Sequence, residues 1–152
     1  MWWEETEVEA TLNEFLAELG WIPGLKPRRV RADIFVVREI DNTRHSLIME
    51  VKGDVVNPTY DPAAYRNKYM QIILGQLLCR TGDDQCGYDD RTILGIGIPD
   101  PCKDDSHFFV EYFANRLAFS IRETLRLCIF KVNQEHEVTA EIPPSVSRRL
   151  FS

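Results

Sequence analysis

The sequence has no long hydrophobic run, no C-x2-C pair of cysteines and no excess of positive charge. No apolar stretch approaches the roughly 18 to 20 residues that span a bilayer, so a membrane protein is not expected. The four cysteines are scattered, which argues against an iron–sulfur cluster, and we expect them to stay reduced. Residues 1–5 are acidic where a secretory signal would be basic, so we expect a cytoplasmic protein.

The charge balance limits how the chain can bind nucleic acid. A formal net charge of −6 is the reverse of the basic surface that neutralises phosphates, so any such surface must be local. The densest cluster of positive residues is the candidate nucleic-acid-binding segment, and it comprises Lys26, Arg28, Arg29 and Arg31. Part of the acidic excess would be offset if some of the carboxylates held cations.

Hydrophobic periodicity and turn residues predict a mixed α/β protein. With 152 residues, we expect one domain, residues 1–152, with a central sheet flanked by helices. Helices are predicted at 6–19, at 62 to about 80 and within 107–125, the second capped by Asp61 with Pro62 at its first position. Strands are predicted at 30–40, 46–52, 92–98, 127–132 and 138–142.

Three polar residues on the first two of these strands form the strongest candidate site. Asp33, Glu50 and Lys52 have the spacing D-x16-E-x-K. Alternate residues of a strand share a face, so Glu50 and Lys52 project together, and Asp33 joins them if the strands pair side by side. Hydrolysis of a phosphodiester needs carboxylates that hold a divalent metal and a positive group near the phosphate. These residue types supply both.

The surroundings of these residues favour a functional site over an ordinary ion pair at a strand edge. Leu47, Ile48 and Met49 precede Glu50, and apolar residues follow Asp33. Unpaired charge beside such apolar runs is costly. E-x-K alone is common by chance, and a solvent-facing Glu–Lys pair remains the alternative.

The arrangement resembles the PD-(D/E)XK nuclease superfamily, which has the restriction-endonuclease-like fold. That fold has the core order helix, three strands, helix, strand, with Asp on the second strand and E-x-K on the third. The resemblance covers about residues 5–98, with Ala32 in place of the usual Pro. A first strand ahead of Asp33 is not obvious unless residues 21–22 or 26–31 supply it. The resemblance implies Mg²⁺, or Mn²⁺ as a substitute, held by Asp33, Glu50 and the backbone carbonyl of Val51.

Many members of the superfamily add an acidic residue from the first helix. Glu9 lies at the edge of the apolar stripe, and Glu5 lies nearer the centre of the stripe but one turn earlier. The segment 9–21 is similar to the first helix of archaeal Holliday-junction resolvases, in which a site Glu precedes the closing Gly by this interval. We therefore expect Glu9 to join the site, with a solvated helix face as the alternative.

The second helix offers Gln76. RecB-type members place Gln in a Q-x-x-x-Y motif here, but the Tyr is absent, so RecB-type membership is not implied. Gln76 is predicted on the buried side of the helix and Gln71 on the opposite side. Gln76 would then bond the waters of the metal site or Lys52, or else be a core Gln bonded to backbone. The predicted stripe on that buried side comprises Tyr65, Tyr69, Ile72, Ile73 and Leu77.

Tyr65 and Lys68 lie near the loop after the motif, where a substrate strand would pass, so both are candidates for binding nucleic acid. The sequence thus predicts a Mg²⁺-dependent nuclease, a DNA endonuclease or a resolvase-like enzyme. Such an enzyme would act as a homodimer or as a subunit of a larger complex. A non-catalytic nucleic-acid- or protein-binding subunit that keeps the fold is the alternative, and an unrelated α/β protein is a third.

Overall fold

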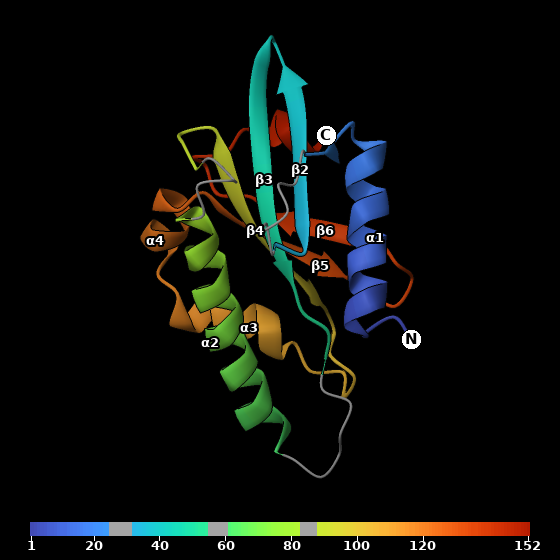
Figure 1. Cartoon of the computed structure of the whole chain (residues 1–152). Helices are drawn as coiled ribbons and strands as arrows, with labels where there is room; N and C mark the ends of the chain where they lie inside the picture. The colour runs from blue at the N-terminus through green and yellow to red at the C-terminus, as the bar shows by residue number, and fades with distance from the viewer. Residues whose placement is uncertain (25–31, 55–60, 83–87) are drawn as a thin grey trace.

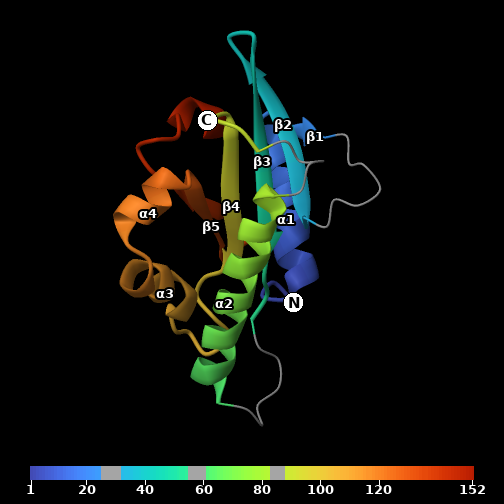
Figure 2. The same cartoon turned by 60° about the vertical axis from the view of Figure 1, so that its left-hand side comes forward.

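The computed structural model describes residues 1–24, 32–54, 61–82 and 88–152. It confirms a mixed α/β architecture, with one six-stranded sheet in the order β1-β2-β3-β4-β5-β6 and helices on both faces (Figures 1 and 2). The elements in chain order are α1 (Glu5–Glu18), β1 (Ile22–Pro23), β2 (Ile34–Ile40), β3 (Thr43–Val51), α2 (Pro62–Thr81), β4 (Thr92–Pro99), α3 (Phe108–Arg116), α4 (Phe119–Thr124), β5 (Leu127–Val132), β6 (Val138–Glu141) and a final 3-10 helix (Arg148–Phe151).

The sheet combines antiparallel pairs at its edges with parallel pairs at its centre. Strands β2 and β3 form a hairpin whose turn residues, Asp41 and Asn42, have φ of 53° and 62°. Asn and Asp tolerate these values, and a tight turn of this kind matches the twist of the two strands. The parallel pairs β3–β4 and β4–β5 need crossovers, which α2 and then α3 with α4 provide.

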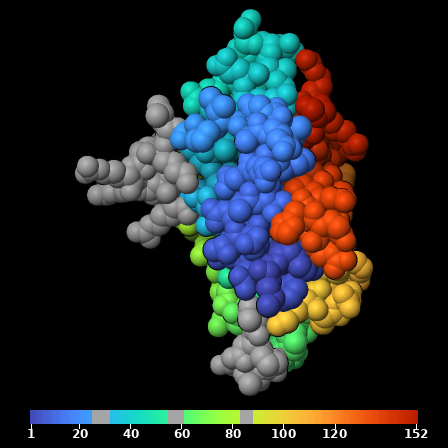
Figure 3. Space-filling view, turned by 90° about the vertical axis from the view of Figure 1, so that its right-hand side faces the viewer, coloured from blue at the N-terminus to red at the C-terminus, as the bar shows by residue number. Residues whose placement is uncertain are grey.

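Two apolar cores fill the two faces of the sheet. Helix α1 packs Val8, Leu12 and Leu16 against one face, and Figure 3 shows it beside the chain that follows residue 130. Helix α2 packs Ile73 and Leu77 against the other face, where α3 joins it. Side chains of β3 alternate between these cores, so residues 48, 50 and 52 lie on the α2 face.

Several predicted boundaries need correction. The single helix expected within 107–125 is wrong, because the chain is extended at Leu117 (φ −125°, ψ 116°) and divides α3 from α4. The strand expected from residue 30 is described only from Ile34. The first strand is the two-residue β1, which is too short to show any periodicity. No helix in the described part of the chain has the length and apolar character to cross a membrane.

Candidate functional site

The hairpin of β2 and β3 brings Asp33 and Glu50 together. Its register pairs Ile34 with Met49, so one further step places Asp33 opposite Glu50. Asp33 is fixed there because its Oδ2 accepts a hydrogen bond of 2.7 Å from the backbone N–H of Val51. Val51 lies just beyond the part of β3 that pairs with β2. The Asp33 carboxylate therefore takes the place of a strand partner for this amide and is held against the end of β3.

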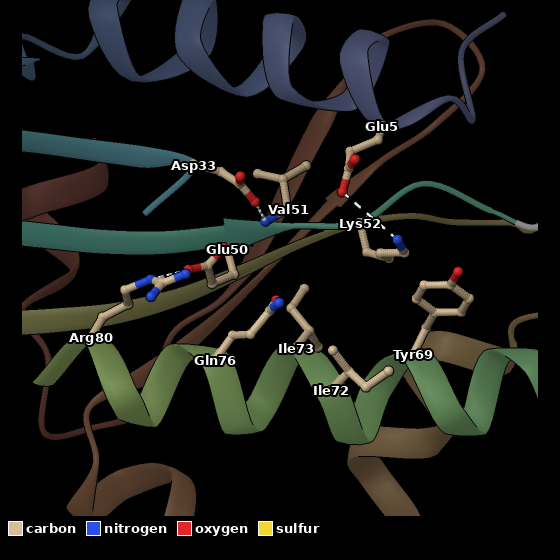
Figure 4. A pocket seen from close by; sticks show the side chains of 10 residues that line it. All are labelled: Glu5, Asp33, Glu50, Val51, Lys52, Tyr69, Ile72, Ile73, Gln76 and Arg80. Atoms are coloured by element: carbon tan, nitrogen blue, oxygen red, sulfur yellow. Dashed lines mark hydrogen bonds and ion pairs between the residues drawn. The ribbon is translucent and has the colours of Figure 1, made fainter. Parts of the chain in front are cut away.

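A cavity of about 270 Å³ opens between the end of β3 and helix α2 (Figure 4). It holds four of the predicted site residues, Asp33, Glu50, Lys52 and Gln76, together with Val51. The carboxylates therefore lie in a solvent-connected hollow, which a substrate or a hydrated cation can enter. The residues that line it are Glu5, Asp33, Glu50, Val51, Lys52, Tyr69, Ile72, Ile73, Gln76 and Arg80.

Glu50 is the most perturbed acid of the cavity. Only 4% of its side chain is exposed, and its Oε1 accepts a hydrogen bond of 2.8 Å from Arg80 Nε. Burial, followed by the neighbouring Asp33 carboxylate, raises the pKa of Glu50 to about 7, while Arg80 acts in the opposite direction. The single guanidinium of Arg80 therefore does not outweigh the effects of burial and of Asp33 on Glu50.

Lys52 lies at the other end of the cavity. Its Nζ is 3.8 Å from the centroid of the Tyr69 ring and 4.0 Å from Glu5 Oε1. The backbone N–H of Lys52 donates to the carbonyl of Gly97, so the strand position is fixed by the neighbouring β4. An aromatic face and a half-exposed carboxylate thus orient the ammonium group without burying it.

The acid from the first helix that lines this cavity is Glu5, not the expected Glu9. The reason is a close approach of the chain before α1 to the segment after β3. The Asp54 N–H donates to the carbonyl of Trp3 over 2.8 Å. A Cβ at Gly53 would collide with the backbone of Trp3 and Glu5, so this residue must be glycine. The contact brings the first turn of α1 beside Lys52.

Gln76 lines the cavity, but its side chain is exposed rather than on the apolar face. The predicted buried stripe of α2 is only partly right, because Ile73 and Leu77 are buried but Tyr65 and Tyr69 are only half-buried. The side chains that are buried include Arg66 and Met70, whereas Ile72 is exposed. Arg66 can be buried because Asp54 accepts two hydrogen bonds from it, of 2.8 and 2.9 Å. A prediction from the hydrophobic pattern places arginine on the surface, and it therefore misplaces part of the buried face of α2.

The predicted nucleic-acid-binding residues are only partly placed. Tyr65 is half-buried, with its ring 4.2 Å from that of Tyr69 and its hydroxyl hydrogen-bonded to that of Tyr69, so it supports the cavity wall from behind. Lys68 is exposed on α2 and does not line the cavity. The basic cluster of Lys26, Arg28, Arg29 and Arg31 lies outside the described residues.

Arg80, Tyr69 and Glu5 line the cavity but were not predicted as site residues. A sequence signal exists for two of them. Tyr69, Gln76 and Arg80 recur at steps of seven and four, which is the spacing of one helical stripe. A stripe through Gln76 therefore identifies both neighbours. The position of Glu5 has no such signal, because it depends on the contact between residue 3 and residue 54.

The donor set suits a small hard cation. Among the described residues, no three His, Cys, Asp or Glu side chains are grouped so that they could hold a metal ion. Asp33 and Glu50 form a pair, and Mg²⁺ takes one or two protein carboxylates with water and substrate oxygens in its other positions. Burial and the neighbouring Asp33 both disfavour the ionised form of Glu50, and a divalent cation held by the two carboxylates would favour it.

Comparison of the sequence with models of protein families finds no matching family, and comparison with curated proteins finds no matching relative. The geometry of the cavity and the order of the elements are therefore what the functional argument rests on.

Proposed function

We propose that this chain is a Mg²⁺-dependent nuclease with a restriction-endonuclease-like fold, which hydrolyses phosphodiester bonds of DNA as an endonuclease or resolvase-like enzyme. The observation that carries the proposal is the gathering of Asp33, Glu50 and Lys52 in one open cavity. The order α1, β1, β2, β3, α2, β4 supports it, because the superfamily core runs helix, three strands, helix, strand. Asp33 directly precedes the second strand, and E-x-K closes the third.

Each side chain has a distinct task in this reaction. Asp33 and Glu50, with the Val51 carbonyl, would hold Mg²⁺ or Mn²⁺, which supplies an activated water and offsets charge on the phosphate when bound. Asp33 is held in place for this by the Val51 N–H. Lys52 carries a positive charge on the same face of β3 and directs it at the scissile phosphate.

Glu5 and Tyr69 position the ammonium group of Lys52. Glu5 Oε1 lies 4.0 Å from Nζ, and the Tyr69 ring lies beneath it. Gln76 is exposed at the cavity and has an amide that can bond a water or a phosphate oxygen. One such site acts on one strand, so a cut through both strands would take two copies of the chain or a partner subunit.

The test is cleavage of linear, branched and single-stranded DNA with Mg²⁺ or Mn²⁺. We expect Lys52→Ala and Glu50→Ala to lower the rate by at least about 10²- to 10³-fold, since each removes charge stabilisation at the reacting centre. Lys103→Ala, at an exposed lysine that follows β4 and lies outside the cavity, is the matched control for Lys52→Ala. Cleavage that survives both site substitutions would place the chemistry elsewhere.

A non-catalytic subunit that keeps the fold is the second candidate. The observation that favours it is the ion pair between Glu50 and Arg80, in which an arginine already compensates part of the charge on a predicted metal ligand. Such a protein would bind its partner without taking up a divalent ion at Asp33. Titration calorimetry with Mn²⁺ separates the two candidates, because only the nuclease requires uptake that Asp33→Asn removes.

A further inference from the structure

Arg80 is the cation of the cavity that the proposed reaction does not use. It sits near the end of α2, and 18% of its side chain is exposed. Its Nε donates to Glu50 Oε1 over 2.8 Å. Within the described part of the chain, Nη1 and Nη2 have no hydrogen-bond partner. The guanidinium is thus anchored at one nitrogen, and its outer edge remains available to a ligand.

The cavity presents its charges in a row along α2 (Figure 4). Lys52 and Tyr69 lie at one end with Glu5 beside Lys52, Arg80 lies at the other end, and the carboxylates of Asp33 and Glu50 lie between them. From Tyr69 to Arg80 the helix advances about 16 Å at 1.5 Å per residue. A nucleic-acid strand carries one phosphate per about 3.4 Å of helix axis, so this length spans more than one phosphate.

The outer edge of the guanidinium suits an anion that presents two oxygens, and in a nuclease site that anion is a backbone phosphate. A guanidinium presents paired N–H donors in a fork that matches two oxygens of a phosphate. Arg80 keeps its positive charge when a cation offsets the charge of Glu50. A second anion can then bind Nη1 and Nη2, while Nε keeps the arginine in place.

We propose that Arg80 is a phosphate-binding residue, which holds a second backbone phosphate of the strand whose scissile phosphate Lys52 faces. A single DNA strand would then lie along α2 from Tyr69 to Arg80, with its scissile bond over Asp33 and Glu50. This inference rests on the proposed nuclease function and names the path of the strand through the same site. The alternative role for Arg80 is a counter-ion of Glu50 with no contact to the substrate.

The experiment measures DNA binding without metal, in a background in which Glu50 carries no charge. Fluorescence anisotropy records binding of a labelled single-stranded DNA oligonucleotide to full-length Glu50→Gln in EDTA over a series of salt concentrations. The same series is run with Arg80→Ala, Arg80→Gln and Arg80→Lys in that background. Arg149→Ala is the matched control, because Arg149 is also ion-paired but is exposed and lies outside the cavity.

The expected result is a loss of one phosphate contact. Arg80→Ala and Arg80→Gln should each weaken binding several-fold and reduce the slope of log K against log salt by about 0.7. Arg80→Lys should keep most of the slope, since it retains the charge, and Arg149→Ala should leave it unchanged. Arg80→Gln keeps the first three carbons of the side chain and a polar end without the charge, and serves if Arg80→Ala does not fold.

Two results would overturn the inference. One is an unchanged salt slope in both Arg80→Ala and Arg80→Gln, and the other is an equal reduction in Arg149→Ala. Either result leaves the nuclease proposal intact as long as the wild-type chain cleaves DNA and Lys52→Ala does not. Conversely, binding that depends on Arg80 in a chain that cleaves nothing would refute the nuclease and keep the phosphate contact.

Discussion

Helix α2 carries two arginines that pair with acids, one at the end of β3 and one just after it, and the two pairs have opposite characters. Arg66 binds Asp54 through two nitrogens, and 5% and 0% of their side chains are exposed. Asp104 also accepts a bond from Arg66, and the Lys103 N–H donates to Asp54. Arg80, in contrast, binds Glu50 through one nitrogen beside an open cavity.

The difference shows which of the two pairs is built for stability. In the closed pair, burial alone would lower the pKa of Arg66, but hydrogen bonds with Asp54 and Asp104 raise it instead. The buried charge of Arg66 is therefore compensated by these hydrogen bonds, and Asp54 does not line the cavity beside Glu50. In the open pair, Glu50 has a pKa of about 7 because burial and Asp33 outweigh Arg80. Acids whose pKa is strongly shifted in this way are found most often at functional sites.

Breaking the closed pair should give the largest effect on stability. Arg66→Ala leaves Asp54 buried without its partner, so we expect a loss of about 3–5 kcal/mol in the free energy of unfolding. Arg80→Ala should cost less, about 2 kcal/mol or below, because Glu50 can take up a proton when its partner is absent. Urea denaturation of the two variants measures both values. Equal losses would show that the open pair is as structural as the closed one.

The open pair should also make stability depend on pH. The pKa of Glu50 is higher in the folded chain than its ordinary value of 4.5, so a proton favours the folded state. Stability should therefore fall as pH rises from about 4.5 to about 7, by at most about 3 kcal/mol, and level off above that range. Glu50→Gln should lack this component. The check is the difference in unfolding free energy between wild type and Glu50→Gln, measured in EDTA at a series of pH values.

If that difference stays constant between pH 4.5 and 8, then Glu50 is not held in the buried, acid-paired environment described above. With Mn²⁺ present, the fall should shrink, because a bound cation stabilises the ionised carboxylate and stabilises the folded state by mass action. Cation binding should for the same reason strengthen as pH rises through about 7.

The smallest expected effect separates the two first-helix acids. Glu5→Gln should lower DNA cleavage by about two- to fivefold, because a half-exposed ion pair with Lys52 contributes at most about 1 kcal/mol. Glu9→Gln is the matched control, since it removes the same charge one turn further along α1, outside the cavity. Cleavage rates under saturating Mg²⁺ measure both. A larger loss in Glu9→Gln would restore the residue that the sequence predicts.

Most of the fold could be predicted because its signals are local. The apolar stripe of α1, the Asp61 cap of α2 and the β-branched strands each depend on residues close together in the chain. The break at Leu117 could not be predicted, because the steps of four from Phe113 to Leu125 continue across it. The short strand β1 likewise depends on pairing with β2 rather than on its own pattern.

The site residues divide in the same way, into those with a local sequence signal and those whose position depends on distant parts of the chain. Asp33, Glu50 and Lys52 follow from two strands and their alternation, and the cavity contains all three. The rotation of α2 could not be predicted, because it depends on the burial of Arg66 by an acid outside the helix. Glu5 could not be selected over Glu9 for a related reason. Its place depends on the contact that Gly53 permits between β3 and the chain before α1.

The most direct test of the central claim is a crystal structure of the wild-type chain soaked in Mn²⁺, with anomalous scattering to locate the ion. We expect one strong peak within coordinating distance of Asp33 and Glu50, and no such peak in Asp33→Asn. Bound Mn²⁺ elsewhere on the protein, with none at these two carboxylates, would contradict the assignment of this cavity as the metal centre of a nuclease.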